Sequence, residues 1–401
     1  MSKTVGIVAE YNPFHRGHQH QIEQIRARHE DAAIIAVLSS SFLQRGVPAL
    51  TDKWTRAQTA VQCGADLVLE LPIPFCCANA GTFATGAVQL LKATDAVDAL
   101  SFGMENADGM NGAIPAILVQ EPPAFKTGLQ KFLQKGYSYA QARAEAADIC
   151  CPGAAALLSR PNNTLAFAYA EAVLRENAGF ELIPIQRTGS GYHDTASGDM
   201  MSAAGVRQAL ARGSLSVLDA IPQASARAVQ TALAQGRCLL DDAPLWSALR
   251  LLLMRSRADD LARYAEISEG IENRFLSQYA ECSSWSEFVD RTATRRYPRT
   301  RVQRQMISLL LNVTHEESRE YQARGPAYIR PLAMNRRGRQ LLRRMSADAA
   351  LPVITKPASL KGNAYAQKIM SLEFRAAAIW ESLVPHPNWR RELTAVPAYV
   401  E

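Results

Sequence analysis

The chain has 401 residues, more than one hydrophobic core usually serves, so its length predicts two domains. Its residues are 48% hydrophobic and 20% charged, a balance that excludes an intrinsically disordered protein. Apolar runs fall short of the roughly 18 to 20 residues of a membrane span, and the run 5–9 is too short for a signal peptide. We therefore expect a soluble, cytoplasmic protein without membrane contact. The net charge of +6 is small for this length, so the placement of basic residues matters more than their sum.

Strand-like and helix-like patterns alternate over the first half of the chain. Branched apolar runs predict strands at 4–9, 32–39, 66–71, 97–102 and 181–186. Helical patterns lie between them at 17–28, 53–63, 78–92 and 165–177. This alternation is typical of an α/β fold with a doubly wound, Rossmann-like parallel sheet. Ligands bind such sheets beyond the carboxyl ends of the strands, so we expect the site in segments 10–18, 40–52, 103–105 and 187–207.

Strand patterns disappear beyond residue 215, apart from a short apolar run at 353–355. Helical patterns follow at 216–234, 244–257, 260–277 and 302–311. We place a domain boundary near residue 215. The sequence then predicts an α/β nucleotide-binding domain over 1–215 and a mostly α-helical, arginine-rich domain over 216–401.

The seven cysteines form no recognisable metal site. Their number is odd and no CxxC spacing occurs among Cys63, Cys76, Cys77, Cys150, Cys151, Cys238 and Cys282. The pattern favours buried or free thiols in a reducing compartment over disulfides or a zinc centre. We predict no protein-bound metal.

The string NPFHRGHQH concentrates histidines directly after the first predicted strand. A turn at Asn12 and a helix starting near Gly17 would place backbone N–H groups at a helix N-terminus, which is an anion site. His15 and His18, three residues apart, can face one side and donate hydrogen bonds to phosphate oxygens. Two other interpretations stay open. One is a structural histidine cluster that caps the turn. The other is a metal site through His15, His18 and His20, although no cysteine or paired carboxylate completes its ligand set.

The string HRGH in this position resembles the H-x-G-H motif of the nucleotidyltransferase superfamily, which is similar to class I aminoacyl-tRNA synthetases. Proteins of that superfamily bind ATP, and attack on its α-phosphate releases pyrophosphate. Their second motif, of the I-S-S-T-x-x-R type, is similar to MSAAGVR at 201–207, in which Ser202 and Arg207 match. Ala204 departs from the motif because it lacks the hydroxyl often found there.

Longer strings narrow the resemblance. They are IVAEYNPFHRGH, FLQRGVPALTDKWTRAQTAVQCGADLVLELP, FATGAVQLL and IQRTGSGYHD, followed by EGIENRF, RRYPRTRVQRQMISLLL and LPVITK. Together they cover most of the chain and resemble the bacterial tRNA(Met) cytidine acetate ligases. One departure is Ser40-Ser41, where the resemblance leads us to expect Gly-Asn.

The resemblance implies an enzyme that activates acetate with ATP, forming acetyl-adenylate and pyrophosphate. It would then acetylate the N4 amine of the wobble cytidine in elongator tRNA(Met). No acyl-enzyme is needed in such a reaction, so no nucleophilic Cys or Ser is required. Mg²⁺ is implied by the ATP chemistry alone, since no acidic cluster in the sequence marks a site for it.

The resemblance also implies roles for particular residues. His15 and His18 would be catalytic, binding phosphates and stabilising the transition state at the α-phosphate. The nucleotide-binding set would comprise Ile7, Val8, Ala9, Glu10, Tyr11, Asn12, Pro13, Phe14, His15, Arg16, Gly17, His18, Gln19, His20, Gly103, Asn162, Arg187, Thr188, Ser202 and Arg207.

Several members of this set have simpler interpretations that stay open. Gly103 would only end a strand, and Arg187 would be a surface arginine. Asn162 and Ser202 would each cap the helix that follows. Outside the set, Lys53 and Arg56 would either reach phosphate or tRNA or lie on a solvated helix face.

Arginines gather in two places in the second half of the chain. The first group, which we predict to bind RNA, is Arg291, Arg295, Arg296, Arg299, Arg301 and Arg304, with no acidic residue after Asp290 until Glu316. The second group is Arg336, Arg337, Arg339, Arg343 and Arg344. A solvated face is the simpler interpretation of such runs.

Two other functions remain open at this point. A small-molecule adenylyl- or cytidylyltransferase would share the histidine motif but would leave the arginine-rich half unexplained. A noncatalytic RNA-binding protein on the same fold would explain Ala204 but not the intact HRGH string.

Overall fold

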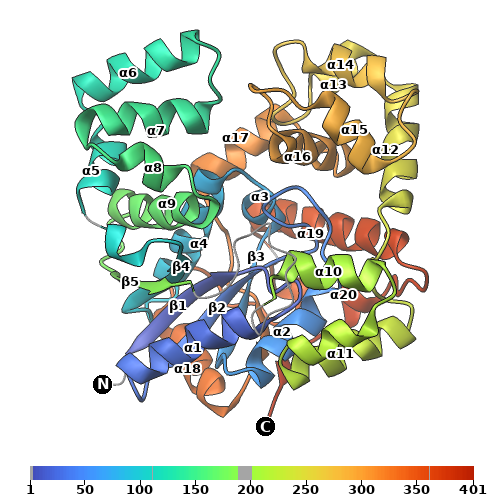
Figure 1. The fold of residues 1–401 in the computed structure, drawn as a ribbon. Coiled ribbons are helices and arrows are strands. Elements are labelled where there is room, and N and C mark those ends of the chain that lie inside the picture. The colour runs from blue at the N-terminus through green and yellow to red at the C-terminus, as the bar shows by residue number, and fades with distance from the viewer. Residues whose placement is uncertain (1–2, 111, 188–200, 361) are drawn as a thin grey trace.

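The structure, a computed structural model, describes residues 3–110, 112–187, 201–360 and 362–401. Its centre is a seven-stranded sheet in the order β5-β4-β1-β2-β3-β6-β7 (Figure 1). The strands are β1 (Thr4–Ala9), β2 (Ala33–Ser39), β3 (Leu67–Leu71), β4 (Ala99–Met104), β5 (Glu181–Gln186), β6 (Pro331–Met334) and β7 (Ala398–Tyr399). All neighbours are parallel except β3 and β6. The predicted α/β class with a mostly parallel sheet is confirmed.

Helices cover both faces of the sheet and extend beyond it. They are α1 (Arg16–Arg28), α2 (Lys53–Gln62), α3 (Ile73–Cys76), α4 (Ala80–Ala93), α5 (Ala113–Gln120), α6 (Pro123–Gln134), α7 (Tyr139–Cys150), α8 (Ala154–Leu158), α9 (Pro161–Arg175), α10 (Ala203–Ala211), α11 (Gln223–Ala234), α12 (Ala243–Arg255), α13 (Ala258–Leu261), α14 (Ile271–Gln278), α15 (Trp285–Thr292), α16 (Arg299–Leu310), α17 (His315–Arg324), α18 (Arg336–Asp348), α19 (Ala364–Leu383) and α20 (Arg391–Thr394). Among the helices of the described ranges, none combines the length and apolarity that crossing a bilayer requires.

Strand β2 shows why the sheet forms. All its residues are buried, and alternate side chains enter different cores. Ile35 and Val37 pack with apolar residues of α4 and α9, whereas Ile34 and Ala36 pack with those of α1 and α2. A continuous apolar run with two covered faces is what a central parallel strand requires.

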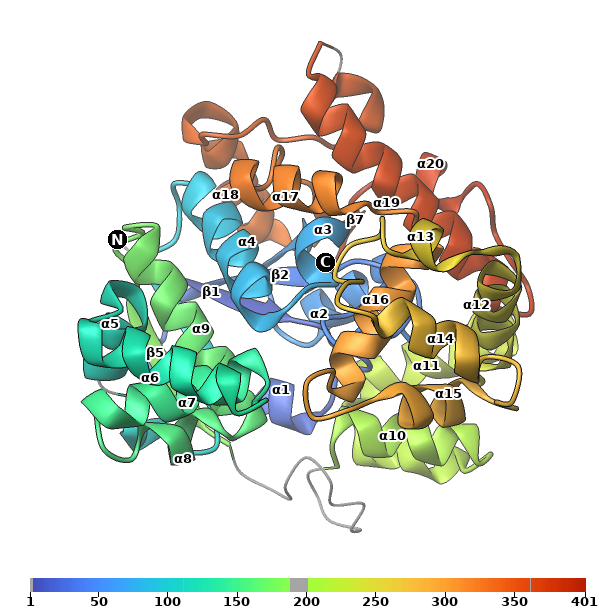
Figure 2. The same cartoon turned by 90° about the horizontal axis from the view of Figure 1, so that it is seen from above.

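Two helical lobes lie on opposite sides of the carboxyl ends of the central strands (Figures 1 and 2). One lobe, α5 to α8, is inserted between β4 and α9, where no element was predicted. The other, α12 to α16, follows the predicted boundary. The predicted helix over 260–277 is wrong, because Gly270, with φ of 88°, separates α13 from α14.

The expectation that strands end near residue 215 is also wrong. Strand β6 pairs antiparallel with β3, and β7 extends the sheet beyond β6. Both strands are too short to show a period of two, and for that reason the sequence pattern missed them. The run 353–355 contributes only a bridge between Val353 and Ile329. One sheet therefore takes strands from both sides of the boundary, and the division into 1–215 and 216–401 stays a prediction.

Lys53 is buried in the protein interior, so it does not lie on a solvated helix face. It is also out of reach of phosphate or tRNA, so both interpretations of it were wrong. Its Nζ pairs with Glu70, with Glu373 at 3.1 Å and with Glu392 at 2.9 Å. Arg330, the residue directly before β6, also pairs with Glu70 at 3.4 Å and with Glu392 at 2.5 Å. This buried ionic cluster joins α2 and β3 to α19 and α20, far along the chain.

Arg56 is likewise structural, because it is buried and donates to backbone carbonyl oxygens. Its Nη1 donates to Glu10 at 2.8 Å and to Ser39 at 2.9 Å, and its Nη2 donates to Ser40 at 2.5 Å. Burial lowers the pKa of Arg56 to about 10. The departure at Ser40 places a hydroxyl that donates to Glu373 at 2.5 Å. Arg56, which the sequence left open as a phosphate or tRNA contact, thus ties α2 to the carboxyl ends of β1 and β2.

Candidate active site

A cavity of about 490 Å³ lies beyond the carboxyl ends of β1 and β4. Its walls come from the loop after β1 and from the first turns of α1, α9 and α10. Most of the predicted nucleotide-binding residues line it: Val8, Ala9, Glu10, Tyr11, Asn12, His15, Gly17, His18, His20, Gly103, Asn162, Arg187, Ser202 and Arg207. The position is the one that a doubly wound sheet gives to its ligands.

Other members of the predicted set lie elsewhere: Ile7, Pro13, Phe14, Arg16 and Gln19. Ile7 and Phe14 are buried in the core against α1 and α2. Arg16 points away and donates to the carbonyl of Asp219 at 3.2 Å. Their neighbours on the same loop and helix do line the cavity. Predicting every residue from 7 to 20 as nucleotide-binding was therefore too coarse, because side chains along this segment point in different directions. Thr188 lies outside the described residues.

His15 and His18 cap helix α1 reciprocally. Nδ1 of His15 accepts from the backbone N–H of Gly17 at 3.0 Å, and Nδ1 of His18 accepts from the backbone N–H of His15 at 3.2 Å. The two rings stack with centroids 3.7 Å apart. Because each Nδ1 accepts a hydrogen bond from a backbone N–H, it carries no proton itself. The proton of each neutral ring is therefore on Nε2. The capping interpretation is thus correct, and it leaves each Nε2–H as a donor for a ligand.

The two imidazoles stay neutral at ordinary pH. Burial, with the positive charges of Arg187 and Arg207 acting in the same direction, lowers the pKa of His15 to about 3. Burial, His15 and Arg187 together hold the pKa of His18 well below its usual value. The rings therefore act as uncharged hydrogen-bond donors beside two guanidinium groups, an arrangement suited to a polyanion.

Aromatic rings hold His18 in place. Tyr11 adopts a left-handed backbone conformation with φ of 45°, and its ring lies edge-on to His18 at 4.9 Å. Phe14 packs against Tyr11 at 4.7 Å and against His18 at 5.4 Å. Phe14 does not line this cavity, but it supports His18, which does.

Helix α10 is tied to the histidine loop. Oγ of Ser202 accepts from the backbone N–H of Gly205 at 3.2 Å, so its interpretation as a helix cap is correct. Arg207 donates from Nη1 to the carbonyl of Asn12 at 2.6 Å. Oδ1 of Asn12 in turn accepts from the backbone N–H of Leu50 at 2.7 Å. The second motif is thereby fixed to the first, while its contact with a nucleotide stays a prediction.

Gly103, Arg187 and Asn162 form the opposite wall. A Cβ added at Gly103 would lie 3.3 Å from Cγ of Arg187, so glycine leaves room for this arginine. The interpretation that Gly103 only ends the strand is wrong, because β4 continues through it to Met104. Nδ2 of Asn162 donates to Oε1 of Glu105 at 2.6 Å. The interpretation of Asn162 as a helix cap is wrong, because the capping position of α9 belongs to Arg160.

Several lining residues were absent from the predicted set: Gln21, Leu43, Gln44, Arg45, Val47, Ala80, Phe83, Phe102, Pro161, Thr164, Leu165, Tyr169, Ile185, Gln186, Ala203, Ala204 and Thr300. Gln44 approaches the histidine loop because its backbone N–H donates to Oε1 of Glu10 at 2.9 Å. The only signal for it was position, since 40–52 follows the carboxyl end of β2. Thr300, from α16, had no sequence signal, because nothing local brings α16 to this cavity.

Protein ligands for a metal are not apparent within the described residues, where no group of three or more His, Cys, Asp and Glu side chains is placed to hold an ion. The metal interpretation of the histidines fails on geometry, because their Nδ1 atoms accept backbone N–H groups. Glu10 is the carboxylate that lines the cavity. A Mg²⁺ site built by the protein does not fit this donor set.

Comparisons with known proteins agree with the geometry. A family model described as HIGH Nucleotidyl Transferase matches residues 2–394. A protein of Leuconostoc mesenteroides named tRNA(Met) cytidine acetate ligase is 34% identical over 409 residues, with 100% of both chains covered. Another of that name, from Syntrophotalea carbinolica, is 37% identical and covers 88% of this chain and 84% of its own.

Solved structures add the fold at full length. Apo Thermotoga maritima TmcAL has a TM-score of 0.93 at 28% identity, over 99% of each chain. The crystal structure of the same protein bound with alpha-thio ATP has a TM-score of 0.90, again at 28% identity and 99% coverage of each chain. The chain belongs to the tRNA(Met) cytidine acetate ligase family.

The arginines of the first group, predicted to bind RNA, are mostly neutralised. The pairs are Arg291 with Glu281 and Glu287, Arg296 with Glu269, Arg299 with Asp290, and Arg304 with Glu266. Arg304 is also buried. Arg295 and Arg301 stack instead on Tyr137 at 4.1 Å and Tyr297 at 4.5 Å. The absence of acidic residues between Asp290 and Glu316 in the sequence therefore did not show the charge around these arginines in space. The RNA-binding role of this group stays a prediction.

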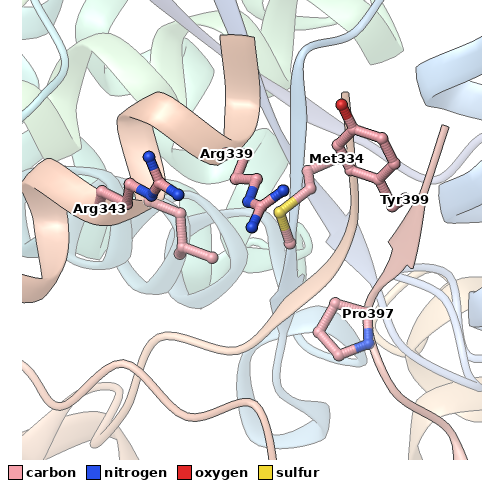
Figure 3. A pocket seen from close by; sticks show the side chains of 6 residues that line it. Met334, Arg339, Arg343, Pro397 and Tyr399 are labelled. Atoms are coloured by element: carbon pink, nitrogen blue, oxygen red, sulfur yellow. The ribbon is translucent and has the colours of Figure 1, made fainter. Parts of the chain in front are cut away.

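The second arginine group differs from the first. It lies on α18, where Arg336, Arg339, Arg343 and Arg344 are exposed. In the part of the chain that the structure describes, an acidic partner is found only for Arg337, with Asp31 at 4.0 Å. Arg339 and Arg343 border a cavity of about 330 Å³ together with Tyr399 (Figure 3). Helix α18 begins beside the amino end of β3, at the edge of the sheet opposite to the histidine cavity.

Proposed function

We propose that this protein is an ATP-dependent ligase that acetylates N4 of the wobble cytidine of elongator tRNA(Met). The family to which it belongs supports this reaction class, since its relatives are named for it. The observation that carries the proposal is the histidine cavity, in which two neutral imidazole donors and two arginines converge beyond the strand ends. The relatives favour this ligase over a small-molecule transferase, and the intact donor set argues against a noncatalytic RNA-binding protein.

The proposed reaction has two steps, the adenylation of acetate and the transfer of its acetyl group. A carboxylate oxygen of acetate attacks the α-phosphorus of ATP, and pyrophosphate leaves with its bonding electrons. The N4 amine of cytidine then attacks the carbonyl carbon of acetyl-adenylate, AMP leaves, and the amine loses one proton. Cytosine's amine is a weak nucleophile, so the mixed anhydride supplies the driving force that free acetate lacks.

The chain's own residues would serve mainly to hold and stabilise charge. The Nε2–H groups of His15 and His18 would donate to oxygens of the α-phosphate as negative charge builds there. Arg187 and Arg207 would bind the rest of the polyphosphate, and Ser202 would contact its end. Mg²⁺ would enter together with the nucleotide, as its counter-ion. We place the reaction in the cytoplasm, where ATP and tRNA meet.

Transfer of labelled acetate to RNA tests this proposal. The protein is incubated with ATP, Mg²⁺, radiolabelled acetate and bulk bacterial tRNA, and digested RNA is examined for N4-acetylcytidine. Label should appear with the natural protein, vanish without ATP, and fall at least a hundredfold in His18→Ala. His29→Ala, at the opposite end of the same helix, is the matched control and should keep full activity. Pyrophosphate release that requires a small acceptor instead of RNA would overturn the proposal.

A further inference from the structure

A second cavity, of about 790 Å³, adjoins the histidine cavity. The two share lining residues, namely Gln44, Ala80, Thr164 and Thr300. Because these residues face both spaces, a group bound in one cavity can reach a group bound in the other. The larger cavity is lined by residues of α4, α7, α9 and α16. Of these helices, α7 belongs to one lobe and α16 to the other, and Figure 2 shows the two lobes facing each other.

The walls of this second cavity suit a nucleotide of single-stranded RNA. Tyr139, at the start of α7, lines it and is 59% exposed, with the guanidinium carbon of Arg143 6.0 Å from its ring centroid, so the ring is accessible to a base. Arg301, on α16, lines the facing wall. Its guanidinium stacks on Tyr297 at 4.5 Å, and among the described residues no acidic side chain pairs with it.

Other cations in the same cavity are already engaged with carboxylates. Arg143 and Arg175 share one carboxylate, that of Glu171, at 3.0 Å and 3.1 Å, and Arg296 pairs with Glu269 at 2.9 Å. Arg304 forms a two-pronged pair with Glu266, with both distances 3.1 Å. Arg301 is therefore the cation of this wall that a phosphate can approach without displacing a carboxylate.

We propose that the second cavity binds the target nucleotide of the RNA substrate, with Tyr139 stacking a base of the unpaired loop and Arg301 binding a phosphate. The nucleotide then presents its exocyclic amine to the acyl-adenylate across the shared wall of Gln44 and Thr300. This inference rests on the proposed function. The two lobes would grip one loop of RNA between them, and neither lobe alone would complete the pocket.

Kinetics with two variants test the inference. In Tyr139→Ala and Arg301→Gln, KM for tRNA should rise roughly tenfold each, since one stacked base or one phosphate contact is lost. ATP affinity, measured by calorimetry, should stay within twofold, because neither residue lines the histidine cavity. Trp389→Ala and Arg319→Gln, an exposed tryptophan and an exposed arginine outside the described cavities, are the matched controls and should leave both quantities unchanged.

Equilibrium binding separates this inference from the proposed function. A fluorescent anticodon stem-loop RNA is titrated into the natural protein and each variant, without ATP or acetate. Weaker binding by the two cavity variants alone supports the inference whether or not acetyl transfer occurs. Unchanged RNA affinity in both variants overturns it, even if the natural protein acetylates tRNA. If the natural protein binds the stem-loop but transfers no acetate, only the proposed function fails.

Discussion

The histidine cavity and the buried ionic cluster around Lys53 are built from similar charged and polar side chains, yet one faces a ligand space and the other does not. In the cavity, Arg187 and Arg207 lie beside uncharged imidazoles. In the cluster, carboxylates of Glu70, Glu373 and Glu392 already surround Lys53.

This difference teaches that burial alone does not distinguish a site from a structural element. The distinction lies in where each cation is placed. Lys53 is enclosed by carboxylates and stabilises the fold, whereas Arg187 and Arg207 line a cavity beside uncharged imidazoles, a position suited to an incoming anion.

The largest effect should come from breaking the ionic cluster. Lys53→Met removes one cation from among buried carboxylates, and the free energy of unfolding should fall by about 3–5 kcal/mol. Urea unfolding measures this change. Lys135→Met, on an exposed helix end, should change it by less than about 0.5 kcal/mol. A similarly small loss at Lys53 would show that the cluster is not structural.

The histidine pair should show the reverse behaviour. In His15→Asn the asparagine side chain can still cap α1, but the Nε2–H donor is gone. We expect the rate of acetyl transfer to fall about 10²–10³-fold while the thermal unfolding temperature stays nearly constant. Activity assays and melting curves on one preparation measure both. A fall in stability with intact activity would assign His15 to the fold alone.

The two regions should respond to pH in opposite directions. The folded pKa of His15 is lowered to about 3, so between that value and 6.5 the unfolded chain binds more protons, and stability falls as pH falls through this window. Burial and Glu70 raise the pKa of Glu373 to about 7, so its contribution is present below about 4.5 and is lost as pH rises towards 7.

Urea unfolding between pH 5 and 8 separates the two contributions. Relative to the natural protein, His15→Asn should lose less stability on acidification, and Glu373→Gln should lose less as pH rises. Parallel pH curves for all three proteins would contradict the assignment.

The smallest effect should distinguish the arginine groups. If α18 contacts the RNA backbone, Arg336→Gln and Arg343→Gln should each lower the slope of log affinity against log salt by about 0.9. Arg299→Gln should leave the slope unchanged, because Asp290 already neutralises that side chain. Filter binding of tRNA over a salt series measures the slopes. A change at Arg299 with none on α18 would reverse the comparison.

The sequence could predict those features that depend on neighbouring residues. Each of the five strands up to Gln186 carries a compact apolar run, and the HRGH string follows the first of them. Because parallel strands end at one edge, those facts also predicted where a cavity would lie. His15 and Arg207, far apart along the chain, do line it together.

What the sequence could not predict depends on partners far along the chain. Nothing near Lys53 announces the carboxylates of α19 and α20 that surround it. Arg304 likewise seemed available until the fold brought Glu266 to it. Strand β6 is recognisable only once the edge of β3 that it covers is known, and Thr300 reaches the cavity only through packing of the second lobe.

The ionic cluster also bears on how the chain is made. Glu70 and Arg330 are 260 positions apart, and Lys53 and Glu373 are 320 apart. At a synthesis rate of about 5–20 residues per second, a ribosome would take tens of seconds to deliver those partners. During that interval the edge of β3 stays unpaired, with Lys53 and Glu70 lacking their remaining counter-charges. A nascent chain in this state presents an open strand edge, the kind of surface that chaperones shield from neighbouring chains.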